Sequence, residues 1–432
     1  MPLVSSILQL LRNQLHSKDR YRLVVRLQGH RRPINCIVFT PSAKTLASGG
    51  DDETVKIWCL EKASCSQTLC DNLGRWGQIT CMLFIGKNGD WLLFGTGRGL
   101  LLIYGCAKGG LYRPMCILQV SEGSDPVESL CFDHHSSRIA IGSHYGDVKV
   151  YKVELSESRV ETTLDWSRRM AKSIPRSMAF INEGKDMLVF GLNTGDVYAI
   201  LNVCVYEMPR DYRTYLNPNK KGEITGQKLL EWPIGNATVN DTEKMVLVHN
   251  IAKGFDLYGL PTLSLIHSMI TRKKTCIIKD VKFGEDSSVA IGGSDHGTVY
   301  VLNLETAVIE QELRHGNSGE FIQAVDASSS SEGYLIASGG GSSVVDPDVC
   351  LWEKPTRLTI SRRRGQSRTQ DCLGVLIALT LIAFLCQSSG GWSALVRNFA
   401  CTCRHLWPLF TGVKVVKDTG IEPQTSLEII RL

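Results

Sequence analysis

The stretch LQGHRRPINCIVFTPSAKTLASGGDDETVKIW, residues 27–58, decides how the whole chain is interpreted. It begins with the pair Gly29-His30, and an apolar alternation follows over Ile34–Phe39. An acidic turn at Asp51-Asp52 leads into a last apolar run that ends at Trp58. Period-two alternation bounded by Gly, Pro and Asp signals is typical of short antiparallel strands. The stretch therefore predicts three strands joined by tight turns.

A Gly-His opening and a Trp-ended strand within about 40–45 residues form the sequence signature of one propeller blade. On these residues the chain resembles the WD-repeat proteins. The resemblance implies a buried hydrogen-bond relay of His30, Ser48, Asp52 and Trp58. A buried indole N–H and a buried imidazole both need partners, and a carboxylate can hold one imidazole tautomer. A Ser-His-Asp set could also suggest a hydrolase, but the resemblance favours the structural role, and the sequence contains no Gly-x-Ser-x-Gly elbow.

The third strand of this repeat recurs along the chain in degraded form, at intervals of about 49 residues, close to a propeller period. The aligned residues are Val55, Leu101, Val148, Val197, Phe255, Val299 and Val349. A further strand, Tyr21–Gln28, precedes the first repeat. We therefore predict an all-β fold, a seven-bladed WD-repeat β-propeller over residues 21–353 whose N-terminal strand completes the last blade and removes a free sheet edge.

The relay is predicted to be complete in the first blade alone. The last blade keeps Ser338 and Trp352, with His315 as a candidate partner, while a longer loop replaces its acidic turn. In the middle blades an apolar residue or Gly stands at the Ser position, for example Phe190 in the fourth blade. Asp348, close to the longer loop, is interpreted as a solvated turn residue.

Composition excludes several classes of function. The net charge of +5 is small for 432 residues and gives no reason to expect nucleic-acid binding. The 15 cysteines are interpreted as free thiols, and those placed within strand patterns, such as Cys276, as buried ones. No Cys-x-x-Cys pair suggests a zinc site. We therefore expect no metal, no cofactor and no catalytic activity.

The loops between second and third strands are the predicted contact surface for partners. At the positions equivalent to Asp52 they carry Arg98, Tyr145, Thr194 and His296. By the resemblance, the face and central channel of the ring are expected to bind proteins or peptides. The alternative for each residue is a plain turn role.

An insertion at Val203–Gly226 is the second candidate surface. It is predicted to be an exposed loop, and it carries Tyr212, Arg213 and Tyr215, residue types that are enriched at binding hot spots. A tolerated insertion with no function is the alternative.

The chain ends are predicted to lie outside the ring. Residues 1–20 are expected to form a short helix or arm, residues 354–371 a basic flexible linker, residues 372–396 a transmembrane helix and residues 397–432 a tail. The run Cys372–Cys386 has 15 residues without a charge and follows a cluster of arginines. This pattern favours a single membrane pass with the ring in the cytosol. A buried or interfacial helix in a cytoplasmic protein is the alternative.

These observations predict a non-catalytic scaffold that binds protein partners and is tethered to a membrane. Two other classes of function stay open: a soluble or peripheral propeller that reads lipid headgroups, and a propeller enzyme whose site the sequence does not reveal.

Overall fold

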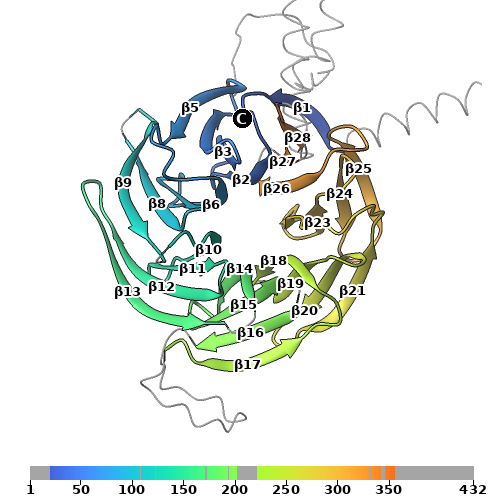
Figure 1. Cartoon of the computed structure of the whole chain (residues 1–432). Helices are drawn as coiled ribbons and strands as arrows, with labels where there is room; N and C mark the ends of the chain where they lie inside the picture. The colour runs from blue at the N-terminus through green and yellow to red at the C-terminus, as the bar shows by residue number, and fades with distance from the viewer. Residues whose placement is uncertain are drawn as a thin grey trace, which may run out of the picture. The chain divides into compact units, whose positions relative to one another are not determined.

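The computed structural model describes residues 20–107, 109–121, 123–170, 173–192, 194–201, 221–330, 333–341 and 346–355. Within them every regular element is a β-strand, which confirms the all-β prediction (Figure 1). In this part of the chain no helix has the length and apolar character needed to cross a membrane. The N-terminal arm at 1–19, the apolar run at 372–396 and the tail lie outside the described residues, as does the basic linker from residue 356 onward.

The strands form antiparallel meanders, each running outward from a first strand near a common centre (Figure 1). The first three meanders are β2 (Ile34–Phe39), β3 (Thr45–Gly50), β4 (Thr54–Cys59) and β5 (Ser64–Cys70); β6 (Ile79–Ile85), β7 (Trp91–Thr96), β8 (Leu100–Cys106) and β9 (Tyr112–Gln119); and β10 (Val127–Asp133), β11 (Arg138–Ser143), β12 (Asp147–Leu155) and β13 (Val160–Arg169).

The fourth and fifth meanders belong to one eight-stranded sheet, joined by a single parallel pairing of Leu192 with Ile234. They are β14 (Ile174–Ile181), β15 (Asp186–Leu192), β16 (Asp196–Leu201) and β17 (Ile224–Leu229), then β18 (Ile234–Asn240), β19 (Met245–Asn250), β20 (Gly254–Gly259) and β21 (Ser264–Ile270). The sixth is β22 (Val281–Gly284), β23 (Val289–Gly292), β24 (Thr298–Asn303) and β25 (Ile309–Arg314). The last contains β26 (Ile322–Ser329), β27 (Gly333–Gly340), β28 (Val349–Pro355) and, as its outer strand, β1 (Arg22–Leu27).

A β-bulge recurs in the outer strand of every meander, opposite the position that Trp58 holds in the first. A bulge places two residues against one and turns the extra side chain aside. The extra residues are Ser66, Met115, Asp165, Thr225, Ile266, Glu310 and Val24. Because Leu23 of β1 pairs with Trp352 and Val24 is the extra residue of the bulge that follows, β1 acts as the fourth strand of the last meander, as predicted.

The core consists of hydrophobic clusters, each shared by two neighbouring meanders. In the first, Ile57 and Val55 pack with Leu92 and Phe94 of the next meander. Another joins Leu27 and Val349 of the last meander to Trp58 of the first. The first strands also contact one another in sequence, and β26 contacts β2. Burial therefore links the last meander back to the first.

Several sequence expectations are wrong in detail. In the fourth meander Val189, not Phe190, pairs at the position of Ser48, because the hairpin turn between β15 and β16 is one residue longer. The outer strand there is β17, which takes up the last residues of the predicted 203–226 loop. Cys276 is exposed and precedes β22 rather than lying within it.

Candidate functional site

The four relay residues of the first meander are joined by short hydrogen bonds inside the protein. Trp58 Nε1 donates to Ser48 Oγ over 2.8 Å, and His30 Nε2 lies 2.7 Å from the same oxygen. His30 Nδ1 lies 2.9 Å from Asp52 Oδ2, which also accepts the backbone N–H of Arg31. Burial raises the pKa of the Asp52 carboxyl, but the hydrogen bond and charge of His30, together with hydrogen bonds from the Arg31 N–H and from Thr54, outweigh burial and bring the pKa down to about 2. This set ties β3 and β4 to the connection that precedes β2.

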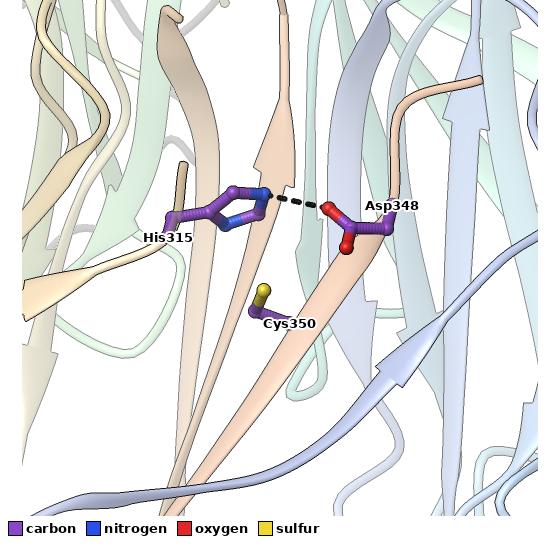
Figure 2. A group of neighbouring side chains, drawn as sticks. All are labelled: His315, Asp348 and Cys350. Carbon is purple, nitrogen blue, oxygen red and sulfur yellow. Dashed lines mark hydrogen bonds and ion pairs between the residues drawn. The ribbon is translucent and has the colours of Figure 1, made fainter. Parts of the chain in front are cut away.

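A second complete relay lies in the last meander. Trp352 Nε1 donates to Ser338 Oγ over 3.1 Å, and His315 Nδ1 lies 2.8 Å from that oxygen. His315 Nε2 lies 3.1 Å from Asp348 Oδ1 (Figure 2). The two ring nitrogens have exchanged roles relative to His30. The prediction that only the first repeat is complete is therefore wrong, and Asp348 has a side chain only 18% exposed rather than solvated.

His315, Asp348 and Cys350 converge closely enough to suggest a metal site, since their ligand atoms lie within 4.8 Å of one another (Figure 2). Their chemistry does not fit one. Both nitrogens of His315 are engaged in the relay, and Asp348 Oδ2 accepts a hydrogen bond from Arg26 Nη1 at 2.8 Å. Burial raises the pKa of the Cys350 thiol far above its usual range, whereas a metal ligand must be a thiolate. The hydrogen bonds of the relay and of Arg26 explain why these side chains lie close together.

A different network replaces the relay in the sixth meander and involves the predicted contact residue His296. Its Nδ1 lies 2.8 Å from Asp295 Oδ1 and its Nε2 lies 2.9 Å from the Tyr300 hydroxyl. Asp295 also accepts the backbone N–H groups of Lys274 and Thr275. With both ring nitrogens bonded and its side chain 14% exposed, His296 is placed for a structural role.

A belt of polar side chains surrounds the cavity of about 320 Å³ lined by the first strands. A β-bulge near the start of most of these strands leaves one extra residue outside the strand pairing. These residues are Asn35, Thr80, Glu128, Arg176, Gly235 and Gln323. Gln323 Nε2 donates to Asn35 Oδ1 at 2.8 Å, and Asn35 Nδ2 donates to the carbonyl of Ile79 in the next meander. Arg176 pairs with Glu128 at 3.1 Å. These polar side chains therefore link neighbouring meanders to one another.

Two of the predicted contact residues, Arg98 and Tyr145, have exposed side chains, and the Tyr145 ring meets that of His144 edge-on at a centroid distance of 5.8 Å. Arg98 lies in the turn between β7 and β8 and is exposed, and Tyr145 lies in the turn between β11 and β12 and is 63% exposed. Neither side chain makes a hydrogen bond or ion pair to the described residues, although the backbone of each turn is held.

Both turns pack against the connection Gly123–Pro126. The backbone N–H of Tyr145 donates to Asp125 Oδ1 at 2.9 Å. A Cβ on Gly99 would lie 2.7 Å from the carbonyl oxygen of Asp125, so a glycine is required for the first turn to approach this closely. We call the turns at 97–99 and 144–146 together with Gly123–Pro126 the rim.

A cavity of about 800 Å³ opens beside the rim, between the second and third meanders. Its lining combines the cations Arg75, Arg98 and Lys149 with Trp76 and Tyr151. This volume lies in the range of pockets that hold small ligands or the side chains of a partner. Lys149 was not among the predicted contact residues, although a lysine inside the apolar run of a third strand indicates a side chain with a polar environment.

The remaining predicted contact residues are placed as follows. Thr194 is exposed, and its Oγ1 accepts the backbone N–H of Asp196 at 3.3 Å, which is typical of a turn residue. Tyr212, Arg213 and Tyr215 lie outside the described residues.

Comparison with known proteins agrees with this geometry. The family model described as "WD domain, G-beta repeat" matches residues 21–59, which span β1 to β4. The chain is 31% identical over 78 residues to periodic tryptophan protein 2 of Arabidopsis thaliana, covering 17% of this chain and 8% of that protein. It is 30% identical over 110 residues to nuclear distribution protein PAC1 of Ajellomyces capsulatus, covering 26% of this chain and 21% of that protein.

The corresponding PAC1 of Gibberella zeae is 46% identical over 43 residues, covering 10% of this chain and 9% of that protein. The chain thus matches less than a quarter of the length of each of these relatives. Together with the all-β meanders, the comparisons support a WD-repeat family for this chain.

Proposed function

We propose that the meanders form a closed seven-bladed propeller in which β1 completes the seventh blade. The recurrent outer-strand bulge and the packing of the last meander on the first support this arrangement. A closed ring leaves the connecting turns as its main adaptable surface.

We propose that this ring is a non-catalytic scaffold that binds protein partners through the rim. The observation that carries the proposal is the pair Arg98 and Tyr145, two exposed hot-spot residue types on either side of one connection, with side chains that bond to no described residue. The matched WD repeat points to the same class of function.

Partner capture from cells that express full-length variants tests the rim. The double variant Arg98→Ala/Tyr145→Ala should lose a reproducible subset of the proteins that co-purify with the wild type. The control Arg159→Ala/Leu164→Ala changes an exposed arginine and a half-exposed leucine at the outer strand of the third meander, and it should keep them. Equal thermal unfolding midpoints show that both variants are folded. Identical partner sets for the two variants would refute the rim as the binding surface.

Membrane tethering is proposed from the sequence alone, from the uncharged run Cys372–Cys386 and the arginines before it. A carbonate wash and protease protection should compare the full chain with a chain stopped after Gly365. The full chain is expected in the membrane pellet with its ring open to protease from the cytosolic side, and the shortened chain in the supernatant. If both chains are extracted by carbonate, the tether is refuted.

A further inference from the structure

The charges around the cavity of about 800 Å³ are of one sign. Arg75, Arg98 and Lys149 line it, and none of its lining residues among the described part of the chain is acidic. Two carboxylates are bonded close to the lining: Asp71 forms two hydrogen bonds of 3.0 Å with the Arg75 guanidinium, and buried Asp125, next to the lining residue Ser124, accepts the Tyr145 N–H. Among the described residues the lining therefore carries an excess of positive charge, although Asp71 offsets that of Arg75.

Hydrogen-bond donors remain available inside the cavity. The Arg98 guanidinium has no partner among the described residues, and its side chain lies over Gly77, where an added Cβ would approach its Cγ to 3.2 Å. Lys149 Nζ gives one hydrogen bond to the carbonyl of Val120 and retains two further N–H groups. The Tyr151 hydroxyl also bonds to no described residue, and burial raises its pKa, so it stays a neutral donor.

An apolar shelf adjoins these donors. Ile117 of β9 is 55% exposed at the cavity, and Leu100 and the ring of Trp76 lie beside it. Trp76 is held in place by edge contacts with Phe94 and Tyr104, at centroid distances of 5.3 and 6.4 Å. A partner group that fits must therefore bring one anionic and one apolar side chain close together.

We infer that this cavity binds an acidic peptide segment of a partner protein, with a carboxylate paired to Arg98 and a neighbouring apolar side chain on Ile117. The inference rests on the proposed scaffold function and names the chemistry of its partner. A carboxylate is favoured over a phosphate because Arg98 alone has an unpaired guanidinium, which matches one carboxylate in a two-bond geometry. Arg75 is already paired with Asp71, so Arg98 supplies the guanidinium left for a ligand and Lys149 the other cation of the lining.

A fluorescence-anisotropy titration of the full chain tests this inference with two labelled peptides, Gly-Glu-Phe-Glu-Phe-Gly and its glutamine counterpart. We expect the glutamate peptide to bind at least about tenfold more tightly and to weaken as salt is raised. Arg98→Ala should lower its affinity about tenfold, and Arg98→Lys by less. The matched control Arg31→Ala removes one exposed charge that does not line the cavity and should stay within about twofold of the wild type.

Two outcomes would overturn the inference: equal binding of both peptides, or equal loss in Arg98→Ala and Arg31→Ala. A peptide with phosphoserine in place of glutamate that binds more than tenfold tighter would overturn the carboxylate assignment.

Tyr145→Ala separates this inference from the scaffold proposal, because Tyr145 lies on the rim but does not line the cavity. It should weaken partner capture and leave peptide binding unchanged. If the rim variants lose partners while the wild type binds neither peptide, the cavity inference is refuted and the scaffold proposal stands.

Discussion

At the scale of single residues, the relay hydroxyls hold buried polar groups whose partners cannot be replaced by water. Ser48 and Ser338 are fully buried, and each bonds to an indole N–H and an imidazole nitrogen. Ser48→Ala and Ser338→Ala should each lower the free energy of unfolding by about 1–3 kcal/mol, because two buried polar groups lose their partner. Urea denaturation measures the change.

Ser64→Ala is the control for these variants. Ser64 is exposed at the start of β5 and its side chain bonds to no described residue, so its loss should change stability by less than about 0.5 kcal/mol. If Ser48→Ala and Ser338→Ala are as mild as Ser64→Ala, the hydrogen bonds of the relays do not stabilise their meanders.

The carboxylate of Asp52 should make the free energy of unfolding depend on pH. The folded-state pKa of Asp52 is lowered to about 2, while an unfolded aspartate titrates near pH 3.9. Its contribution to stability is therefore present above about pH 4 and is lost as the pH falls toward 2. In urea denaturation series the stability difference between wild type and Asp52→Asn should be largest at pH 5 and should narrow at pH 3.

An exposed carboxylate provides the comparison for that series. Glu61 is exposed and bonds to no described residue, so Glu61→Gln should follow the wild type at every pH. A constant difference between wild type and Asp52→Asn from pH 5 to pH 3 would show that the Asp52 charge is not stabilised in the fold.

The two relays also show what the sequence could and could not predict at this scale. The first relay was expected from the resemblance to WD repeats, in which Asp52 stands six residues before Trp58. In the last meander Asp348 stands four residues before Trp352, after a longer connection, so it was interpreted as a solvated turn residue and its place in the relay was missed. The exchange of ring nitrogens at His315 lets the imidazole reach this carboxylate.

At the scale of elements, the bulge in β13 carries a buried charge. Asp165 is the extra residue there, and its carboxylate lies 3.2 Å from Arg138 Nε in β11, with both side chains 8% exposed. Lys221 Nζ lies 2.8 Å from the other carboxylate oxygen of Asp165. Asp165→Asn should cost about 3–5 kcal/mol, since it removes the counter-charge of the buried guanidinium and of Lys221. The double variant Arg138→Met/Asp165→Leu should be markedly milder. Thermal and urea unfolding of the two variants measure the coupling.

The exposed pair of Arg159 and Glu161 provides the contrast on the same strand, because its side chains are 75% and 49% exposed. Glu161→Gln should change stability by less than about 0.5 kcal/mol. If the double variant is as unstable as Asp165→Asn, the charge pair is not the source of the loss, and the packing of these side chains is.

The predicted strand boundaries match the structure where a strand begins at a Pro or Gly turn, and they differ from it where an insertion lies nearby. The first strand of the opening repeat was placed at Ile34–Phe39, the bounds of β2. The outer strand of the fourth meander, Ile224–Leu229, begins inside the predicted loop at 203–226, because polar residues such as Thr225 hid its start. No periodicity marks the bulges, since the extra residue looks like any other member of an alternating strand.

At the scale of the whole molecule, the rim could be predicted only in part. Arg98 and Tyr145 could be predicted because they stand at equivalent positions of successive repeats. The repeat alignment could not reveal that Lys149 and Tyr151 share a cavity with Arg98, because that contact joins different meanders. The alignment likewise treated His296 and Thr194 as equivalent to Arg98, although their side chains are engaged in local hydrogen bonds.

The last prediction concerns the pairing of β1 with the last meander. β1 pairs with β28 along Arg22–Leu27, Arg26 bonds Asp348 at 2.8 Å, and the backbone of Tyr21 exchanges two hydrogen bonds with Gln311 in the sixth meander. A chain that starts at Gly29 loses all of these contacts and exposes the edge of β28, which can pair with another chain. It should unfold at a lower temperature and form dimers or larger species in size-exclusion chromatography.

A chain that starts at Arg20 keeps β1 and is the control, expected to stay monomeric with the unfolding midpoint of the full chain. A synthetic peptide of residues 20–28 added to the shorter chain should pair with the free edge of β28 and restore both properties, because strand addition supplies main-chain hydrogen bonds and the buried Leu27. A peptide with Leu27→Asp should fail, since that side chain packs in the cluster between the last and first meanders. If the chain starting at Gly29 is as stable and monomeric as the control, then β1 only covers the ring and the seven meanders hold together without it.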